Sequence, residues 1–138
     1  MNIYFSCSIT GGRQDQQVYL AIVETLQKAG HEIPTANLSH SDIMGKEAAI
    51  SPAEVYERDV RWVKECDALI AEVSTPSHGV GYEIALALFL NKPVFCCYQQ
   101  NQRVSKMILG NSSPNLLVYP YRSLDDLLPK IEDFLLNV

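Results

Sequence analysis

Basic residues are scarce in this chain of 138 residues. It contains 11 lysines and arginines against 16 aspartates and glutamates, which gives a formal net charge of −5 at pH 7. A nucleic-acid-binding surface depends on clustered Lys and Arg to neutralise phosphates, and here the basic residues are scattered. The composition therefore argues against a nucleic-acid partner. A small anionic ligand remains compatible with it, because a nest of backbone N–H groups can hold a phosphate on an acidic protein.

Metal-site spacing and targeting segments are missing as well. The four cysteines, Cys7, Cys66, Cys96 and Cys97, show neither CxxC spacing nor histidines at zinc-site intervals, so we interpret them as reduced core thiols and expect no metal. The sequence starts MNIYF without a basic leader and apolar block, and no apolar run reaches the length of a membrane span. These absences favour a cytoplasmic protein.

The glycine-rich motifs GxGxxG and GxxxxGK(S/T) are also absent, which makes a dinucleotide-binding or NTP-binding loop a weak hypothesis. What is present is a β-prone run over 2–6, a turn over 8–12 that contains two glycines, and an amphipathic helical pattern over 15–29. With 47% hydrophobic residues, a chain of this length has the size and the core of one domain, which we assign to 1–138.

Strand and helix patterns alternate along the rest of the chain. We therefore predict an α/β fold, a three-layer sandwich with a five-stranded parallel sheet of Rossmann or flavodoxin type in the order 2-1-3-4-5. The long segment 34–51 fits no regular pattern, and loops of this length are usually functional or mobile. Strands are expected at 2–6, 31–33, 68–73, 94–98 and 116–119, and helices at 15–29, 51–66, 81–90 and 123–136.

The stretch 68–83, ALIAEVSTPSHGVGYE, is the centre of this prediction. A buried strand leads into a turn rich in Ser, Thr, Pro and Gly, and Glu83 is expected near the start of the next helix, where free amides and the helix dipole favour an anion. In the predicted order, the loops after Ser6 and Val73 face one crevice at the carboxyl ends of neighbouring strands. Asp59, in the middle of the preceding helix, faces the same crevice.

Each of these side chains also has an ordinary structural interpretation. Glu83 can be a first-turn helix acid, and the tyrosine inside the first strand can belong to the core. Asp59 can be a solvated residue paired with Arg58 or Arg61. Spacing alone also leaves Glu72, at the end of the third strand, as another candidate carboxylate.

Three pieces of the chain, IYFSCSITGGR, ERDVRWVKECDALIAEVSTPSHGVGYEIALA and RVSKMI, resemble the nucleoside 2-deoxyribosyltransferase superfamily. Within it they most resemble the 2'-deoxynucleoside 5'-phosphate N-hydrolases, and the spacing of Asp59, Ser77, Gly79 and Glu83 is the most specific part. The resemblance implies that Glu83 is the nucleophile on the anomeric carbon. It also implies that Asp59 assists at the sugar and the leaving base, and that Tyr4 orients the nucleophile.

The resemblance further implies a phosphate site, with no cofactor and no metal, that is shared between two subunits. Serines hold the 5'-phosphate, and Ser105 reaches in from the second subunit, which predicts a homodimer. Thr10 stands where the N-hydrolases usually carry an arginine, so phosphate affinity or base preference can differ here. Asn37 and His40 are expected to frame the base. The candidate substrate-binding and phosphate-binding residues are Ser8, Ile9, Thr10, Gly11, Ser77, Gly79 and Ser105.

These residue types suit the cleavage of an N-glycosidic bond. Positive charge develops on the sugar in the transition state, and an adjacent carboxylate such as Glu83 stabilises or captures it. A base leaves more readily once it is protonated, which is a role for Asp59. Hydroxyl groups, loop amides and a helix N-terminus bind phosphate without adding a competing negative charge.

Ser77 distinguishes two substrate classes within the superfamily that the chain resembles. The transferases that act on unphosphorylated nucleosides carry an acid at this position, six residues before the nucleophile. An acid there would repel a phosphate, so Ser77 predicts hydrolysis of 2'-deoxynucleoside 5'-monophosphates to free base and 2-deoxyribose 5-phosphate. The sequence leaves open a deoxyribosyltransferase that exchanges bases, an N-glycosidase of ribonucleotides such as CMP, and a nucleotide-binding module without turnover.

Overall fold

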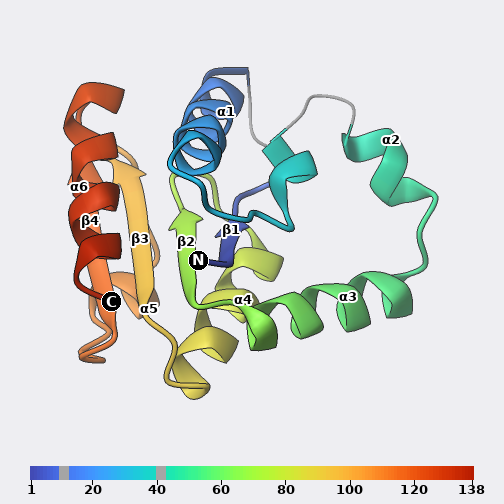
Figure 1. Cartoon of the computed structure of the whole chain (residues 1–138). Helices are drawn as coiled ribbons and strands as arrows, with labels where there is room; N and C mark the ends of the chain where they lie inside the picture. The colour runs from blue at the N-terminus through green and yellow to red at the C-terminus, as the bar shows by residue number, and fades with distance from the viewer. Residues whose placement is uncertain (10–12, 40–42) are drawn as a thin grey trace.

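The computed structural model describes residues 1–9, 13–39 and 43–138. At its centre is a parallel sheet in which these residues form four strands in the order β1-β2-β3-β4 (Figure 1). In the register, Phe5 lies opposite Ile70, and Ile70 lies opposite Phe95. The carboxyl ends of β1 and β2 are therefore neighbours, as the predicted crevice requires. The strands are β1 (Ile3–Ser6), β2 (Ala68–Glu72), β3 (Val94–Gln99) and β4 (Leu116–Tyr121).

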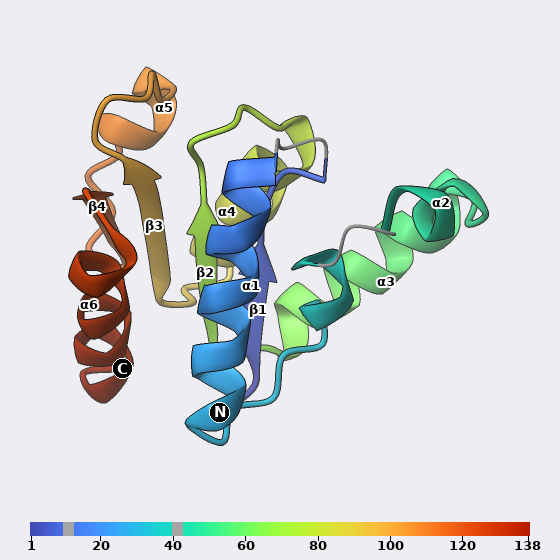
Figure 2. The same ribbon diagram turned by 90° about the horizontal axis from the view of Figure 1, so that it is seen from above.

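Helices cover both faces of the sheet, which confirms the predicted three-layer α/β sandwich. The helices α1 (Arg13–Lys28) and α6 (Leu124–Leu136) pack on one face, and α3 (Pro52–Glu65) and α4 (His78–Phe89) pack on the other (Figure 2). In the ranges that the structure describes, no helix is both long and apolar enough to cross a membrane. The short elements are η1 (Ala36–Ser39), α2 (Ile43–Ala48) and α5 (Lys106–Leu109).

The strands supply alternate residues to two separate cores. Ile3 and Phe5 of β1 pack toward α1 and α6, whereas Tyr4 packs toward α3 and α4, and all three are fully buried. This alternation places Ser6 on the same face as Tyr4, where α4 carries Glu83. The four cysteines are buried in the two cores, which confirms their predicted place in the core.

The predicted strand over 31–33 is wrong, and the described sheet has four strands rather than five. Beside β1 this segment makes only an isolated bridge, at Glu32. Pro34 has no N–H group with which to continue the ladder, and the side chain of Thr35 then takes the place of a strand. Its hydroxyl accepts the N–H of Phe5 at 3.0 Å and donates to the Phe5 carbonyl at 2.7 Å. The four observed strands correspond to the predicted strands 1, 3, 4 and 5, and they lie in the predicted order.

Capping residues determine where the helices begin. Ser51 and Glu54 form the predicted capping box at the start of α3, with each side chain bonded to the other residue's backbone N–H. Ser123 accepts the N–H of Asp126 through its side chain and caps α6, close to the predicted start of that helix.

The helix α4 begins three residues before its predicted start at Gly81. The hydroxyl of Ser77 accepts the N–H of Val80 at 3.4 Å and caps the helix, so the two glycines of this segment are helical. Glu83 consequently lies in the second turn, and its predicted place at the helix start is wrong. Ser77 occupies that place instead.

Candidate active site

A cavity of about 570 Å³ lies at the carboxyl ends of β1 and β2, where the crevice was predicted. Its walls come from the segment after β1, from α2 and α3, and from the first two turns of α4. The predicted residues that line it together are Ser8, Ile9, Asp59, Ser77, Gly79 and Glu83. Segments far apart in the sequence thus supply one site.

Glu83 is a largely buried carboxyl group held by β1. The hydroxyl of Ser6 donates a hydrogen bond of 2.5 Å to Glu83 Oε2. Burial, with a smaller contribution from the Asp59 carboxylate, raises the pKa of Glu83 to about 7. The hydrogen bond from Ser6, the nearby hydroxyl of Tyr4 and the charge of Arg58 oppose this increase. Near neutral pH Glu83 therefore populates both protonation states, and its carboxylate is available as a nucleophile.

Tyr4 lies two residues before Ser6 on the same face of β1 and is fully buried. Its hydroxyl lies close enough to Glu83 to lower the pKa of that group, although it makes no hydrogen bond of regular geometry with a described residue. Burial first, and then the negative charges of Glu83 and Asp59, raise the pKa of Tyr4. The phenol stays protonated and can donate to Glu83, as an orienting role requires.

Asp59 lines the cavity from the middle of α3 and is paired with Arg58 rather than Arg61. The Nε atom of Arg58 donates to Asp59 Oδ1 at 2.8 Å. The same guanidinium group donates to both carboxylate oxygens of Glu47 in α2, at 2.9 and 3.2 Å. Asp59 is thus both ion-paired and part of the cavity wall beside Glu83.

Some of the predicted residues do not meet in this cavity. Thr10 and Gly11 lie outside the described residues, and so does His40. Asn37 lies in η1 and is not part of the described cavity wall. From the segment 34–51, which was expected to frame the base, Glu47 in α2 lines this cavity.

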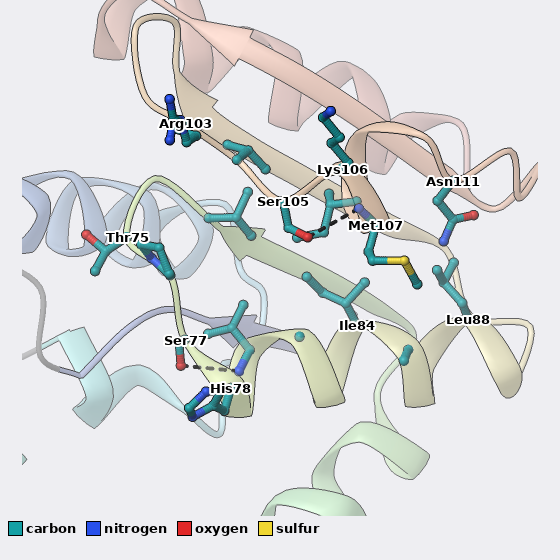
Figure 3. Close-up of a pocket in the computed structure, with 17 residues that line it drawn as sticks. Thr75, Ser77, His78, Ile84, Leu88, Arg103, Ser105, Lys106, Met107 and Asn111 are labelled. Carbon is teal, nitrogen blue, oxygen red and sulfur yellow. Dashed lines mark hydrogen bonds between the residues drawn. The ribbon is translucent and has the colours of Figure 1, made fainter.

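Ser105 lines a second and larger cavity. A groove of about 910 Å³ runs between α4 and α5, and Ser77 and Ser105 lie on its opposite walls (Figure 3). Ile84 faces this groove from α4, and Met107, which is 84% exposed, faces it from α5. Ser77 lines both cavities, so the groove opens beside the site of Glu83. Ser105 itself does not line the described wall of its own chain's Glu83 cavity.

A third cavity, of about 450 Å³, continues from the site between α3 and α4. It shares Glu47, Asp59 and Glu83 with the first cavity and is otherwise mainly apolar, with Val55 and Tyr82 among its walls. A planar heterocycle can occupy such a space, next to the carboxylates. Among the described residues, no three His, Cys, Asp or Glu side chains form a group that could hold a metal ion.

Glu72 lies on the other side of β2 and does not line the cavity. It is fully buried, and the hydroxyls of Ser74 and Tyr121 donate to its Oε1, the latter at 3.0 Å. Burial raises the pKa of Glu72, while these hydrogen bonds lower it. Glu72 therefore fastens the loop that joins β2 to α4.

Sequence reasoning missed Ser6 and Glu47, which hold or line the site. Ser6 follows Tyr4 by two residues in a strand and so shares its face, a periodicity that could have identified it. Glu47 lies in the segment 34–51, where no periodic pattern or motif marks it.

Comparison with known proteins identifies the family of this chain. The model of the family described as nucleoside 2-deoxyribosyltransferase matches residues 3–125. The chain belongs to this family. The match contains both β1 and α4, the elements that hold Ser6 and Glu83.

Two curated relatives support this membership. A protein of Methanococcoides burtonii with the provisional name 2'-deoxynucleoside 5'-phosphate N-hydrolase 1 is 38% identical over 118 residues, which are 86% of this chain and 97% of that protein. The 5-hydroxymethyl-dUMP N-hydrolase of Esox lucius is 42% identical over 115 residues, 80% of this chain and 79% of that protein. The solved structure of a CMP N-glycosidase from Clostridium botulinum matches with a TM-score of 0.74 at 19% identity, covering 97% of this chain and 99% of the other. That likeness shows a shared fold.

Proposed function

We propose that this protein hydrolyses the N-glycosidic bond of 2'-deoxynucleoside 5'-monophosphates and releases the free base and 2-deoxyribose 5-phosphate. The observation that carries the proposal is the cavity itself, in which a largely buried Glu83 with a pKa of about 7 lies six residues after Ser77, the neutral residue that caps α4. The names of the relatives from Methanococcoides burtonii and Esox lucius support the same reaction class.

The reaction proceeds in two steps at Glu83. Its carboxylate oxygen bonds to the anomeric carbon as the bond from that carbon to the base breaks, and the departing base takes the electron pair and a proton. Asp59, on the neighbouring wall, assists this departure. Water then attacks the same carbon and breaks the ester to Glu83, and the proton that this water loses replaces the one that the base took, so that the free sugar phosphate and the Glu83 carboxylate are released.

The Glu83 cavity and the apolar cavity divide the substrate between them. The phosphate lies at the N-terminus of α4 against Ser77 and Ser8, where hydroxyl groups and amides supply donors. The base enters the apolar cavity between α3 and α4. The deoxyribose then lies between them, with its anomeric carbon beside Glu83.

Chromatographic detection of base release tests this proposal on deoxynucleoside 5'-monophosphates, ribonucleoside 5'-monophosphates and unphosphorylated nucleosides. We expect release from the deoxynucleoside monophosphates, and no new nucleotide when a second free base is added. A new nucleotide would show a deoxyribosyltransferase, and release from unphosphorylated nucleosides alone would refute the phosphate site. Substrate-dependent thermal stabilisation without release would indicate a nucleotide-binding module.

We also propose that the active form is a cytoplasmic homodimer in which Ser105 contributes to the partner's site. Its four buried cysteines fit a reducing compartment. The α4–α5 groove supports the shared site, because it places exposed Met107 and Ser105 on one apolar surface that adjoins the phosphate end of the cavity at Ser77.

Replacing Ser105 by alanine is expected to raise KM for the monophosphate by about tenfold, the loss of one hydrogen bond to a charged group. The melting temperature should change by less than about 2 °C, since Ser105 is exposed and caps only the four-residue α5. Exposed Ser112, replaced by alanine, is the control and should leave KM unchanged. A wild-type monomer in sedimentation experiments, or an unchanged KM in the Ser105→Ala variant, would remove the shared site.

A further inference from the structure

Arg58 contacts two carboxylates that line the same cavity. It donates through Nε to Asp59 at 2.8 Å and through both terminal nitrogens to Glu47, at 2.9 and 3.2 Å. The side chains of Arg58, Glu47 and Asp59 are only 20%, 14% and 17% exposed. Charged groups with so little exposure to water are stabilised by one another, because the loss of one group leaves the charge of the others uncompensated.

Helix geometry alone does not produce the contact between Arg58 and Asp59. Adjacent residues of an α-helix point in different directions and do not normally meet. Here the guanidinium group lies over the ring of Trp62, one turn further along α3, with 4.9 Å between its central carbon and the ring centroid. In this position its planar fork fits Glu47 while Nε remains available for Asp59, a division that a lysine ammonium cannot reproduce.

We infer that Arg58 is a positioning residue of the active site, which ties α2 to α3 through Glu47 and fixes the carboxylate of Asp59 beside Glu83. The helix α2 has six residues, and a helix this short is not stable by itself. Its place over the cavity depends on contacts such as this one, and Glu47 lines both the Glu83 cavity and the apolar cavity. This inference rests on the proposed function, since it concerns turnover of the same substrate.

Arg58 also balances the charge around Glu83. Among the described residues that act on Glu83, it is the cation, and its charge opposes the increase in the pKa of Glu83 that burial and Asp59 cause. Its removal leaves the Asp59 carboxylate uncompensated, so the pKa of Glu83 should rise above its value of about 7. The groups around Glu83 are Arg58 and Asp59 from α3, Tyr4, Ser6 and Cys7 from the β1 side, and, on the walls of the same cavity, Glu47 from α2 and His78 from α4.

The test compares Arg58→Gln with Arg61→Gln, which removes the same charge from an exposed position of the same helix. Carbon-13 NMR titration of the Glu83 carboxyl group measures its pKa without any need for turnover. We expect this pKa to rise by about half a unit or more in Arg58→Gln and to stay unchanged in Arg61→Gln. The acid limb of the kcat/KM profile should move in the same direction, with a loss of about threefold or more at pH 6.

Two further variants separate the effect of the link between α2 and α3 from the effect of the positive charge of Arg58. Arg58→Lys keeps the charge and loses the fork, so KM should rise several-fold while the titration of Glu83 stays near that of the wild type. Glu47→Gln releases α2 and should likewise raise KM more than it lowers kcat, without raising the pKa of Glu83.

An Arg58→Gln variant that matches Arg61→Gln in both titration and kinetics would overturn the inference, even where the wild-type protein is active. A wild-type protein without base release would refute the proposed function instead, and the NMR titration would still decide the charge effect of Arg58. If Arg58→Gln fails to fold, Arg58→Lys and Glu47→Gln decide the inference by their KM, and values equal to that of the wild type refute it.

Discussion

Glu83→Gln is expected to lower the rate of base release from a 2'-deoxynucleoside 5'-monophosphate by at least about a thousandfold, because it removes the nucleophile. Glutamine has almost the same shape as glutamate and can still accept the hydrogen bond from Ser6, so the cavity should keep its form. Chromatographic rates at pH 8, with Glu57→Gln on an exposed position of α3 as the control, measure the effect. A loss below about tenfold would show that Glu83 is not the nucleophile.

The same substitution should stabilise the protein, which separates lost chemistry from lost folding. The carboxyl of Glu83 has a pKa near 4.5 in the unfolded chain and about 7 in the native protein, so between these values the native state binds more protons than the unfolded state. Stability attributable to Glu83 is therefore full below about pH 4.5 and is lost as the pH rises through 7. Urea unfolding should show Glu83→Gln more stable than the wild type at pH 8, by an amount on the order of 2 to 3 kcal/mol, and close to it at pH 4.5. Equal stability at both pH values would mean that burial does not perturb this carboxyl.

Ser77→Asp is expected to lower kcat/KM for the deoxynucleoside monophosphate by about a thousandfold. Aspartate is as good an N-cap as serine, so α4 should still begin at the same residue. The new negative charge would lie against the substrate phosphate, and two like charges about 4 Å apart repel by about 4 kcal/mol at an effective dielectric constant of 20.

Ser77→Asn is the matched control, because asparagine also caps the helix and adds no charge. It should lose less than about tenfold in kcat/KM, the cost of altering one neutral hydrogen bond. The comparison is made on a monophosphate and on the corresponding unphosphorylated nucleoside, for which the aspartate variant should not be impaired. Equal losses in both variants, or on both substrates, would show that the phosphate does not lie at the N-terminus of α4.

Much of the fold follows from local patterns that the sequence displays. The buried strands correspond to apolar runs in the sequence. The serine and proline at 51–52 predict the start of α3, and the structure has the start of α3 there. Because β1 and β2 are adjacent, their carboxyl ends bring Ser8 together with Ser77 and Glu83 in one cavity. A single carboxylate has no sequence pattern that identifies its function. Asp59 and Glu83 could be given chemical roles because their spacing resembles that of a known family.

Other features depend on contacts that no local pattern encodes. The segment around Glu32 has strand propensity, yet Pro34 and the hydroxyl of Thr35 end its pairing with β1 after one bridge. The start of α4 was placed too late because glycines disfavour helix, whereas the cap at Ser77 and the packing of the helix on the sheet outweigh that preference. Glu47 reaches the site through Arg58, a tertiary contact between two helices.

The hydroxyl of Thr35 has a consequence for how copies of this protein meet in concentrated solution. The N–H groups of Ile3 and Phe5 on the outer edge of β1 are both occupied, by the carbonyl of Glu32 and by Thr35. At the opposite edge, Pro120 within β4 has no N–H group to offer. Both borders of the sheet are therefore poor templates for adding a strand from another molecule, which limits aggregation through the backbone. Association is left to side chains, such as those of the exposed groove between α4 and α5.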